Sequence, residues 1–138
     1  MILHHKGYLT NNIDKTLNKF LKRGYLVSSN IIHCKIQNVK LIFLKKKNIN
    51  HYVEIIQPTN NNTKLKILHK KINNNYYHIC FLSKNFEKDL IKLKKNNDVR
   101  FITKKSKSKV FAEMIFLKKK GRKLLIEIVS KLKIQLKR

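Results

Sequence analysis

Two glutamates lie inside apolar segments of this sequence, where a carboxylate is costly unless it is paired or bound to a metal. Glu54 and Glu127 are 73 positions apart, and each is flanked by two aliphatic residues. His5 and His78 are separated by the same 73 positions. Two imidazoles and two carboxylates can bind a divalent ion and leave coordination positions for water or substrate. The four residues therefore predict a metal site, for which Co²⁺, Ni²⁺, Zn²⁺ and Mn²⁺ are suitable ions.

Each of these residues has a simpler interpretation when it is taken alone. Strand side chains alternate between two faces, so a lone Glu54 or Glu127 would most often face solvent beside a lysine. A lone His5 or His78 would most often be a strand histidine with satisfied hydrogen bonds. The chain has only 7 acidic residues, however, and two of them occupy matching positions in apolar segments. This coincidence favours a shared site over four unrelated residues.

The same offset relates longer segments and indicates an internal repeat. The letters IFLKKK occur at residues 42–47 and again at residues 115–120. The segment NIDK at residues 12–15 likewise matches NFEK at residues 85–88. The chain is therefore expected to contain one supersecondary unit twice. Each copy begins with a strand that carries a histidine and ends with a strand that carries a glutamate.

The first copy has the pattern of a β-α-β-β-β unit. Residues 2–10 read as a strand, with His5 on one face and His4 on the other. A helix is expected next, because apolar residues recur at helical spacing and Gly24 follows them. The stripe consists of Ile13, Leu17, Phe20 and Leu21. Three extended segments then follow at residues 25–34, 38–46 and 51–57.

The second copy repeats this order after a linker at residues 59–75, which contains a predicted short helix at residues 64–71. A strand is expected at residues 76–83, and Phe86, Leu90 and Leu93 repeat the helical stripe. The remaining strands are expected at residues 99–103, 109–118 and 123–129. The lysine-rich residues 104–109 are predicted to be a solvated, mobile loop.

The charge of the chain is extreme: 33 Lys and Arg stand against 7 Asp and Glu, for a formal net charge of +26. Such a chain could bind nucleic acid or another polyanion. The lysines are spread through every segment, however, and no arginine-rich recognition helix or aromatic platform for single strands stands out. Compositional bias toward residues encoded by A/T-rich codons is therefore favoured, and nucleic acid is disfavoured as a partner.

At 138 residues, the chain has the size of one compact domain or of two small halves that share one core, and its 42% hydrophobic residues are ordinary for a globular chain. No apolar run approaches the roughly 18 residues of a membrane span, and the first strand begins beside Met1, so no signal peptide is expected. Cys34 and Cys80 show no paired metal-ligand spacing, and Cys80 is expected to be a small core residue. A reduced, cytoplasmic location with no membrane partner is the simplest interpretation.

The order of these segments and their motifs resembles the vicinal oxygen chelate superfamily, which includes glyoxalase I, methylmalonyl-CoA epimerase, extradiol dioxygenases and bleomycin-resistance proteins. The resemblance covers nearly the whole chain. It rests on residues 4–9 (HHKGYL), 12–15 (NIDK), 36–44 (IQNVKLIFL), 53–58 (VEIIQP), 77–81 (YHICF) and 125–129 (LIEIV).

This resemblance implies an α+β fold in which two βαβββ modules in tandem form a U-shaped mixed sheet. The whole of residues 1–138 would be a single domain of this superfamily. The first module would span about residues 1–58 and the second about residues 76–131, with the linker at 59–75 between them and a basic tail at 132–138. The family's four metal ligands correspond to His5, Glu54, His78 and Glu127 in this chain.

The implied activity is proton transfer next to a thioester or carbonyl, most like that of methylmalonyl-CoA epimerase. Glu127 would act as the base or lie beside it, and Glu54 is the symmetry-related candidate. The alternatives are a glyoxalase I-type lactoylglutathione lyase, which acts on a thiohemiacetal, and a non-catalytic protein that binds a small ligand. A ring-cleaving dioxygenase is disfavoured, because its site uses two histidines and one carboxylate. A homodimer is expected, because relatives cover their exposed sheet edges in this way.

Two positions and one segment depart from the family pattern. Lys6 follows the first histidine, where an apolar residue is usual. Leu41 occupies a position where some epimerases carry a second acid. Residues 104–111 lack the Gly/Pro-rich pattern of many relatives, and the corresponding loop often lines the substrate mouth. The resemblance therefore implies the ligand set more firmly than the identity of the substrate.

Overall fold

The computed structural model of the chain describes residues 1–137, so Arg138, the end of the predicted basic tail, lies outside the described residues. The chain divides into two compact units. The N-terminal unit comprises His5–Tyr77 and the residues from Gln135 on, and the C-terminal unit comprises Met1–His4 and His78–Ile134. The assignment of residues 1–138 to a single domain stays a prediction. No helix among residues 1–137 is long and apolar enough to cross a membrane.

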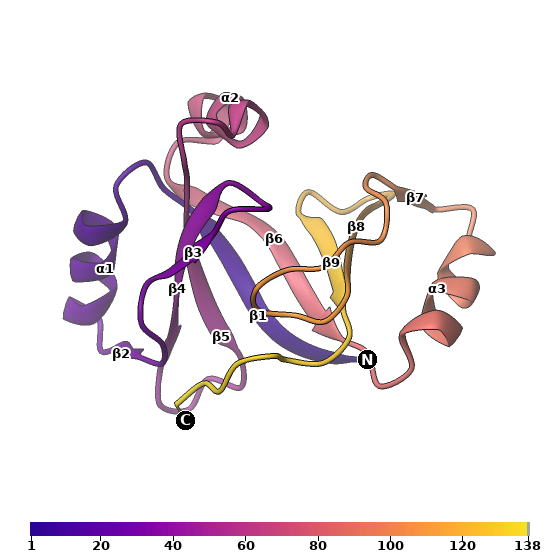
Figure 1. Cartoon of the computed structure of the whole chain (residues 1–138), viewed down its shortest axis with the longest axis horizontal. Coiled ribbons are helices and arrows are strands. Elements are labelled where there is room, and N and C mark those ends of the chain that lie inside the picture. The colour runs from indigo at the N-terminus through magenta and orange to yellow at the C-terminus, as the bar shows by residue number, and fades with distance from the viewer. Residues whose placement is uncertain (138) are drawn as a thin grey trace. The chain divides into compact units, whose positions relative to one another are not determined.

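The N-terminal unit contains a mixed sheet and two helices (Figure 1). Its elements are β1 (Ile2–Leu9), whose residues from His5 on belong to this unit, α1 (Ile13–Lys22), β2 (Leu26–Val27), β3 (Ile32–Cys34), β4 (Val39–Lys45), β5 (Tyr52–Pro58) and α2 (Thr63–Ile72). β5 lies between β1, to which it is parallel, and β4, to which it is antiparallel. Both β2 and β3 pair with β4 in antiparallel fashion.

Helix α1 forms where the apolar stripe predicted it. The side chain of Asn12 caps the helix by accepting a hydrogen bond from the Lys15 N–H at 3.1 Å. Gly24 follows the helix with a φ of +91°, a backbone conformation that glycine adopts without a steric penalty. The buried side chains of Ile13 and Phe20 pack on the sheet against a core that also contains Ile42, Leu44, Val53 and Ile55.

The C-terminal unit repeats this arrangement with β6 (Asn75–Leu82), whose residues from His78 on belong to this unit, α3 (Phe86–Lys94), β7 (Val99–Phe101), β8 (Met114–Lys119) and β9 (Leu125–Val129). β9 lies between β6, to which it is parallel, and β8, to which it is antiparallel, and β7 pairs with β8. Helix α3 packs its apolar stripe on one face of this sheet (Figure 1). The core of the unit contains Phe86, Leu90, Ile115, Leu117 and Ile128.

The offset of 73 residues relates the strand pairing of the two units as well as their amino-acid sequences. Phe43 pairs with Glu54 in the first unit, and Phe116 pairs with Glu127 in the second. The backbone N–H of Thr10 donates to Ile56 O at 2.9 Å, and that of Ser83 donates to Val129 O at 2.8 Å. The internal repeat and the α+β class with two βαβββ modules are therefore confirmed.

The segment at residues 25–34 differs from the single strand that was predicted. It contains two short strands, β2 and β3, because serines interrupt the pairing with β4. The N–H of Ser28 donates to Phe43 O at 2.8 Å, and the Ser29 hydroxyl accepts from the Phe43 N–H at 3.0 Å. The hydroxyl replaces a backbone partner there, so the ladder is broken between the two short strands.

The lysine-rich segment at residues 104–109 is only partly the solvated loop that was predicted. Its lysines are exposed, but Ser108 is buried and its hydroxyl accepts hydrogen bonds from the N–H groups of Val110 and Phe111 at 3.1 Å and 2.8 Å. This turn delays the start of β8 to Met114, five residues later than the sequence suggested. The Lys105 ammonium donates a hydrogen bond to the Glu87 carboxylate at 2.7 Å, and this bond raises the pKa of Lys105.

Candidate metal centre

The N-terminal unit holds the first of two buried His–Glu pairs. His5 on β1 and Glu54 on β5 are 0% and 4% exposed, and His5 Nε2 lies 3.2 Å from Glu54 Oε1. The parallel register places Gly7 directly opposite Glu54. The imidazole of His5 lies two residues earlier on β1, on the same face of the sheet as Gly7, and it reaches the carboxylate.

The C-terminal unit holds the matching pair at the equivalent strand positions. His78 on β6 and Glu127 on β9 are 1% and 4% exposed, and His78 Nε2 lies 3.3 Å from Glu127 Oε1. The residue opposite Glu127 is Cys80, which stands where the first unit has Gly7. The Cys80 sulfur and a Glu127 carboxylate oxygen lie within 4.8 Å of each other.

An aromatic ring holds each imidazole from the side. His5 contacts Phe43 edge-on with ring centroids 5.5 Å apart and an interplanar angle of 78°. His78 contacts Phe116 at 5.5 Å and 90°. Edge-to-face contacts of this kind restrict the rotation of the histidine ring. The ring nitrogen that faces the glutamate is therefore oriented in the same way in both units.

The interpretation in which each glutamate faces solvent beside a lysine is wrong, since both carboxylates are buried. A ring nitrogen and a carboxylate oxygen that face each other at 3.2–3.3 Å can share a proton. The same separation suits two ligands of one ion, because ligands at about 2.1 Å from a metal lie about 3.0–3.4 Å apart at ordinary coordination angles. Each pair therefore offers one nitrogen and one oxygen donor at a separation that suits a divalent ion.

Two lysines lie near His51, the residue before β5. Burial lowers the pKa of His51 below its usual value, and the neighbouring Lys6, Lys45 and His5 lower it further. Lys6 and Lys45 therefore bring positive charge to this end of β5. A substrate with a carboxylate or phosphate group would be attracted to this part of the N-terminal unit.

Two features of the site were not recognised in the sequence. Cys80 was expected to be only a small core residue, yet its thiol is buried beside the Glu127 carboxylate. Its position two residues after His78 on a strand was the available signal, because such residues share a face. Phe43 and Phe116 lie within the repeated hexapeptide, but nothing in their spacing indicated contact with a histidine.

A protein-family model identifies the family of this chain. The model described as the Glyoxalase/Bleomycin resistance protein/Dioxygenase superfamily matches residues 4–117. The chain therefore belongs to this superfamily, the vicinal oxygen chelate class expected from its motifs. No curated protein sequence matches the chain.

Solved structures share the fold at low sequence identity. The methylmalonyl-CoA epimerase of Mycobacterium tuberculosis is 14% identical with a TM-score of 0.79, over 93% of this chain and 86% of that one. A hypothetical protein of Bacillus halodurans C-125 is 22% identical with a TM-score of 0.78, over 99% and 97%. A variant of the Streptomyces coelicolor methylmalonyl-CoA epimerase, in complex with 2-nitronate-propionyl-CoA, is 18% identical with a TM-score of 0.74, over 95% and 97%. These similarities establish the fold.

Proposed function

We propose that this protein is a metal-dependent enzyme that moves a proton on a carbon next to a thioester or carbonyl, most like methylmalonyl-CoA epimerase. The observation that carries the proposal is the repetition of one buried His–Glu pair at equivalent strand positions of both units. Membership of a superfamily that includes such enzymes supports it. So does the similarity of the fold to two methylmalonyl-CoA epimerases.

The proposed ligands are His5, Glu54, His78 and Glu127. Two neutral imidazoles and two carboxylates suit Co²⁺, Ni²⁺, Zn²⁺ or Mn²⁺, and they place two negative charges against the two positive charges of the ion. A bound ion would supply a Lewis acid that polarises the carbonyl oxygen of the substrate. The thiol of Cys80 beside Glu127 adds a softer donor to the surroundings and favours zinc or cobalt over manganese.

The proposed base is Glu127. Its carboxylate takes the proton from the α-carbon, and the electron pair of the broken C–H bond is delocalised onto the carbonyl oxygen of the substrate. Return of a proton to the carbon from the opposite side inverts its configuration. Glu54, after it takes up a proton from solvent, is the candidate for this second transfer, because it occupies the equivalent position in the other repeat and is equally buried. The proton held by Glu127 then returns to solvent. Leu41 is itself buried and apolar, and it supplies no second acid.

The proposed substrate is an anionic thioester, and the chain acts as a cytoplasmic homodimer. The Streptomyces coelicolor relative was solved with a CoA thioester analogue. The lysines near His5 and the net charge of +26 would attract the phosphates of such a molecule. The short strand β7 forms an edge of its sheet, and a second subunit would cover edges of this kind.

The test is solvent exchange at the α-carbon. Metal-loaded protein is incubated with methylmalonyl-CoA in D₂O, and deuterium incorporation is followed by mass spectrometry. We expect exchange by the wild type and a decrease of at least about 100-fold in Glu127→Gln. The matched control Glu113→Gln, which changes a partly exposed carboxylate, should exchange at the wild-type rate.

Two outcomes would count against the proposal. Metal-loaded wild type that leaves the α-proton in place would exclude the epimerase assignment. Exchange only on the thiohemiacetal of methylglyoxal and glutathione, assayed in parallel, would move the assignment to the lyase alternative.

A further inference from the structure

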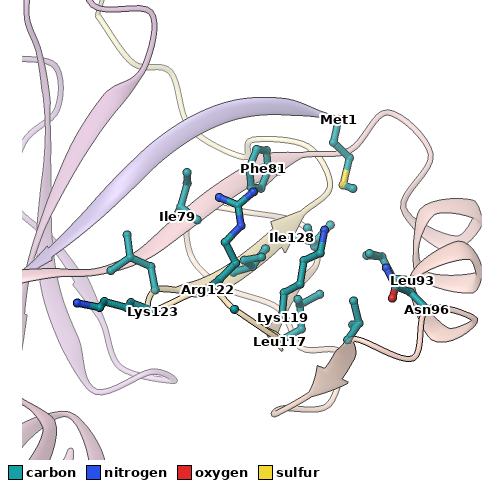
Figure 2. A pocket seen from close by; sticks show the side chains of 14 residues that line it. Met1, Ile79, Phe81, Leu93, Asn96, Leu117, Lys119, Arg122, Lys123 and Ile128 are labelled. Atoms are coloured by element: carbon teal, nitrogen blue, oxygen red, sulfur yellow. The ribbon is translucent and has the colours of Figure 1, made fainter.

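A second site lies in the C-terminal unit, away from the His–Glu pairs. A cavity of about 570 Å³ is located between the end of α3 and the sheet (Figure 2). Its walls are apolar and include Phe81, Leu117, Ile126 and Ile128 from the strands and Leu93 from the helix. The volume is in the range of pockets that bind small molecules, which is about 300–1,000 Å³.

The cavity and the His78–Glu127 pair occupy opposite faces of the same sheet. Ile126 and Ile128 line the cavity and flank Glu127 in β9. Ile79 and Phe81 also line it, and they alternate with His78 and Cys80 along β6. Neighbouring residues of a strand point to opposite faces, so a molecule in the cavity would not touch the proposed metal ligands.

The internal repeat shows what fills the equivalent space in the N-terminal unit. The rings of Tyr8 and Phe20 contact each other edge-on with centroids 5.1 Å apart, and the centroids of Phe20 and Tyr25 are also 5.1 Å apart. The residues 73 positions after Tyr8 and Phe20 are Phe81 and Leu93. One ring of the aromatic cluster is therefore replaced by a smaller aliphatic side chain in the second unit.

A second aromatic ring of the first unit, that of Tyr25 next to β2, also has no aromatic counterpart in the second unit. In the N-terminal unit, the Lys46 ammonium lies over the Tyr25 ring, 5.4 Å from its centroid. Lys119 is the counterpart of Lys46 and is paired in register with Val99. In the first unit Leu26 pairs with Lys45, so Tyr25 stands opposite Lys46. By strand register, a valine therefore takes the place of the tyrosine in the second unit. The cavity thus lies where the first unit has an aromatic ring. Lys119 lines the cavity as Lys46 covers the ring of Tyr25 in the first unit.

The rim of the cavity is positively charged. Lys119, Arg122 and Lys123 belong to the hairpin between β8 and β9, and no carboxylate lines the cavity. None of the three cations forms an ion pair with another residue among 1–137. In Figure 2, the side chain of Arg122 extends toward Phe81, whereas that of Lys123 extends away from the cavity, and Lys119 lines the cavity as well. The rim therefore offers two cations to an anionic group.

We propose that this cavity binds a small aromatic carboxylate. The ring of the ligand occupies the space that Phe20 and Tyr25 fill in the first unit, and it lies beneath the Lys119 ammonium as a cation–π partner. The guanidinium of Arg122 donates hydrogen bonds to the carboxylate.

The test uses 2-naphthoate as the probe, titrated into the full chain and followed by amide chemical shifts. We expect saturable binding with shifts in β7, in the β8–β9 hairpin and at Leu93. Naphthalene-2-methanol, which lacks the charge, and decanoate, which lacks the ring, should bind more weakly. Binding should persist in protein treated with a chelator, because the proposed metal ligands are on the other face.

Matched variants locate the site. Arg122→Gln changes an exposed residue and should weaken 2-naphthoate binding by about tenfold or more. Lys46→Gln, the equivalent of changing Lys119 in the first unit, should leave the affinity unchanged. The double variant Leu93→Phe and Val99→Tyr restores the two rings and should abolish binding.

Three results would overturn the proposal. The first is the absence of saturable binding of 2-naphthoate by the wild type. The second is an affinity that Arg122→Gln does not change. The third is a set of shifts that grows with protein concentration in the absence of the probe, since this would show that a second copy of the chain covers the cavity.

Discussion

At the scale of single residues, the burial of Glu54 and Glu127 decides how they should be interpreted. A carboxylate that is 4% exposed inside a sheet must be paired, and in each unit an imidazole nitrogen lies 3.2–3.3 Å from the carboxylate. The repetition of the pair at strand positions 73 residues apart makes an accidental ion pair a poor explanation. Removal of one partner would take an interaction from a buried group, which is costly.

His51 provides a pH-dependent prediction at the same scale. Its pKa is lowered in the folded chain by burial and by the neighbouring charges of Lys6, Lys45 and His5. The unfolded chain therefore binds a proton at His51 more readily, so stability is lost as the pH falls through the usual value of 6.5. Urea unfolding at pH 7.5 and 5.5 should show a smaller loss of stability on acidification for His51→Gln than for the wild type. An identical loss in both proteins would contradict this account.

At the scale of elements, α1 and α3 begin at the same local signal, an asparagine whose side chain caps the helix. Asn85 caps α3 by accepting a hydrogen bond from the Lys88 N–H at 3.2 Å, as Asn12 caps α1. Asn85→Ala should destabilise the protein by about 0.5–2 kcal/mol, because this N–H would lose its partner. Thermal or urea unfolding measures the change. Asn11→Ala, an exposed asparagine beside the cap of α1, should change stability by less than about 0.5 kcal/mol. Equal effects of the two substitutions would refute the capping role.

The sequence was sufficient for the elements whose signals are local. The apolar stripe of Ile13, Leu17 and Phe20 predicted α1, and the repeat then predicted α3. The interruption of residues 25–34 was not predictable, because it depends on hydrogen bonds to a distant strand: the Ser28 N–H donates to Phe43 O, and the Ser29 hydroxyl accepts from the Phe43 N–H. The buried turn at Ser108 was missed because the surrounding lysines dominate the local pattern.

The candidate site was predictable for a related reason. His5, Glu54, His78 and Glu127 are unusual residues for their segments, and their common offset revealed them. Their pairing distances depend on strand register, which spacing alone does not define. The cavity of the C-terminal unit was not foreseen either, because it results from the absence of two rings and not from the presence of a motif.

At the scale of the whole molecule, the net charge of +26 is the dominant feature. Of the 7 acidic residues, Glu54 and Glu127 are buried with histidines, so few carboxylates remain to offset the 33 cations. Repulsion among the lysines opposes folding and is screened by salt. Raising NaCl from about 0.05 M to about 0.5 M should therefore raise the unfolding midpoint by about 3–5 °C, in the range that about 1 kcal/mol produces. Calorimetry in which the midpoint falls with salt would show that attractive pairs dominate instead.

We propose that the two His–Glu pairs together bind one divalent ion, and metal titration tests this proposal most directly. Chelator-treated protein is titrated with Co²⁺ or Zn²⁺ by calorimetry, with Glu54→Gln and Glu127→Gln measured in parallel. We predict one ion per chain for the wild type and a loss of affinity of at least about tenfold in either variant. No binding, or two ions per chain of which each variant removes only one, would contradict the claim.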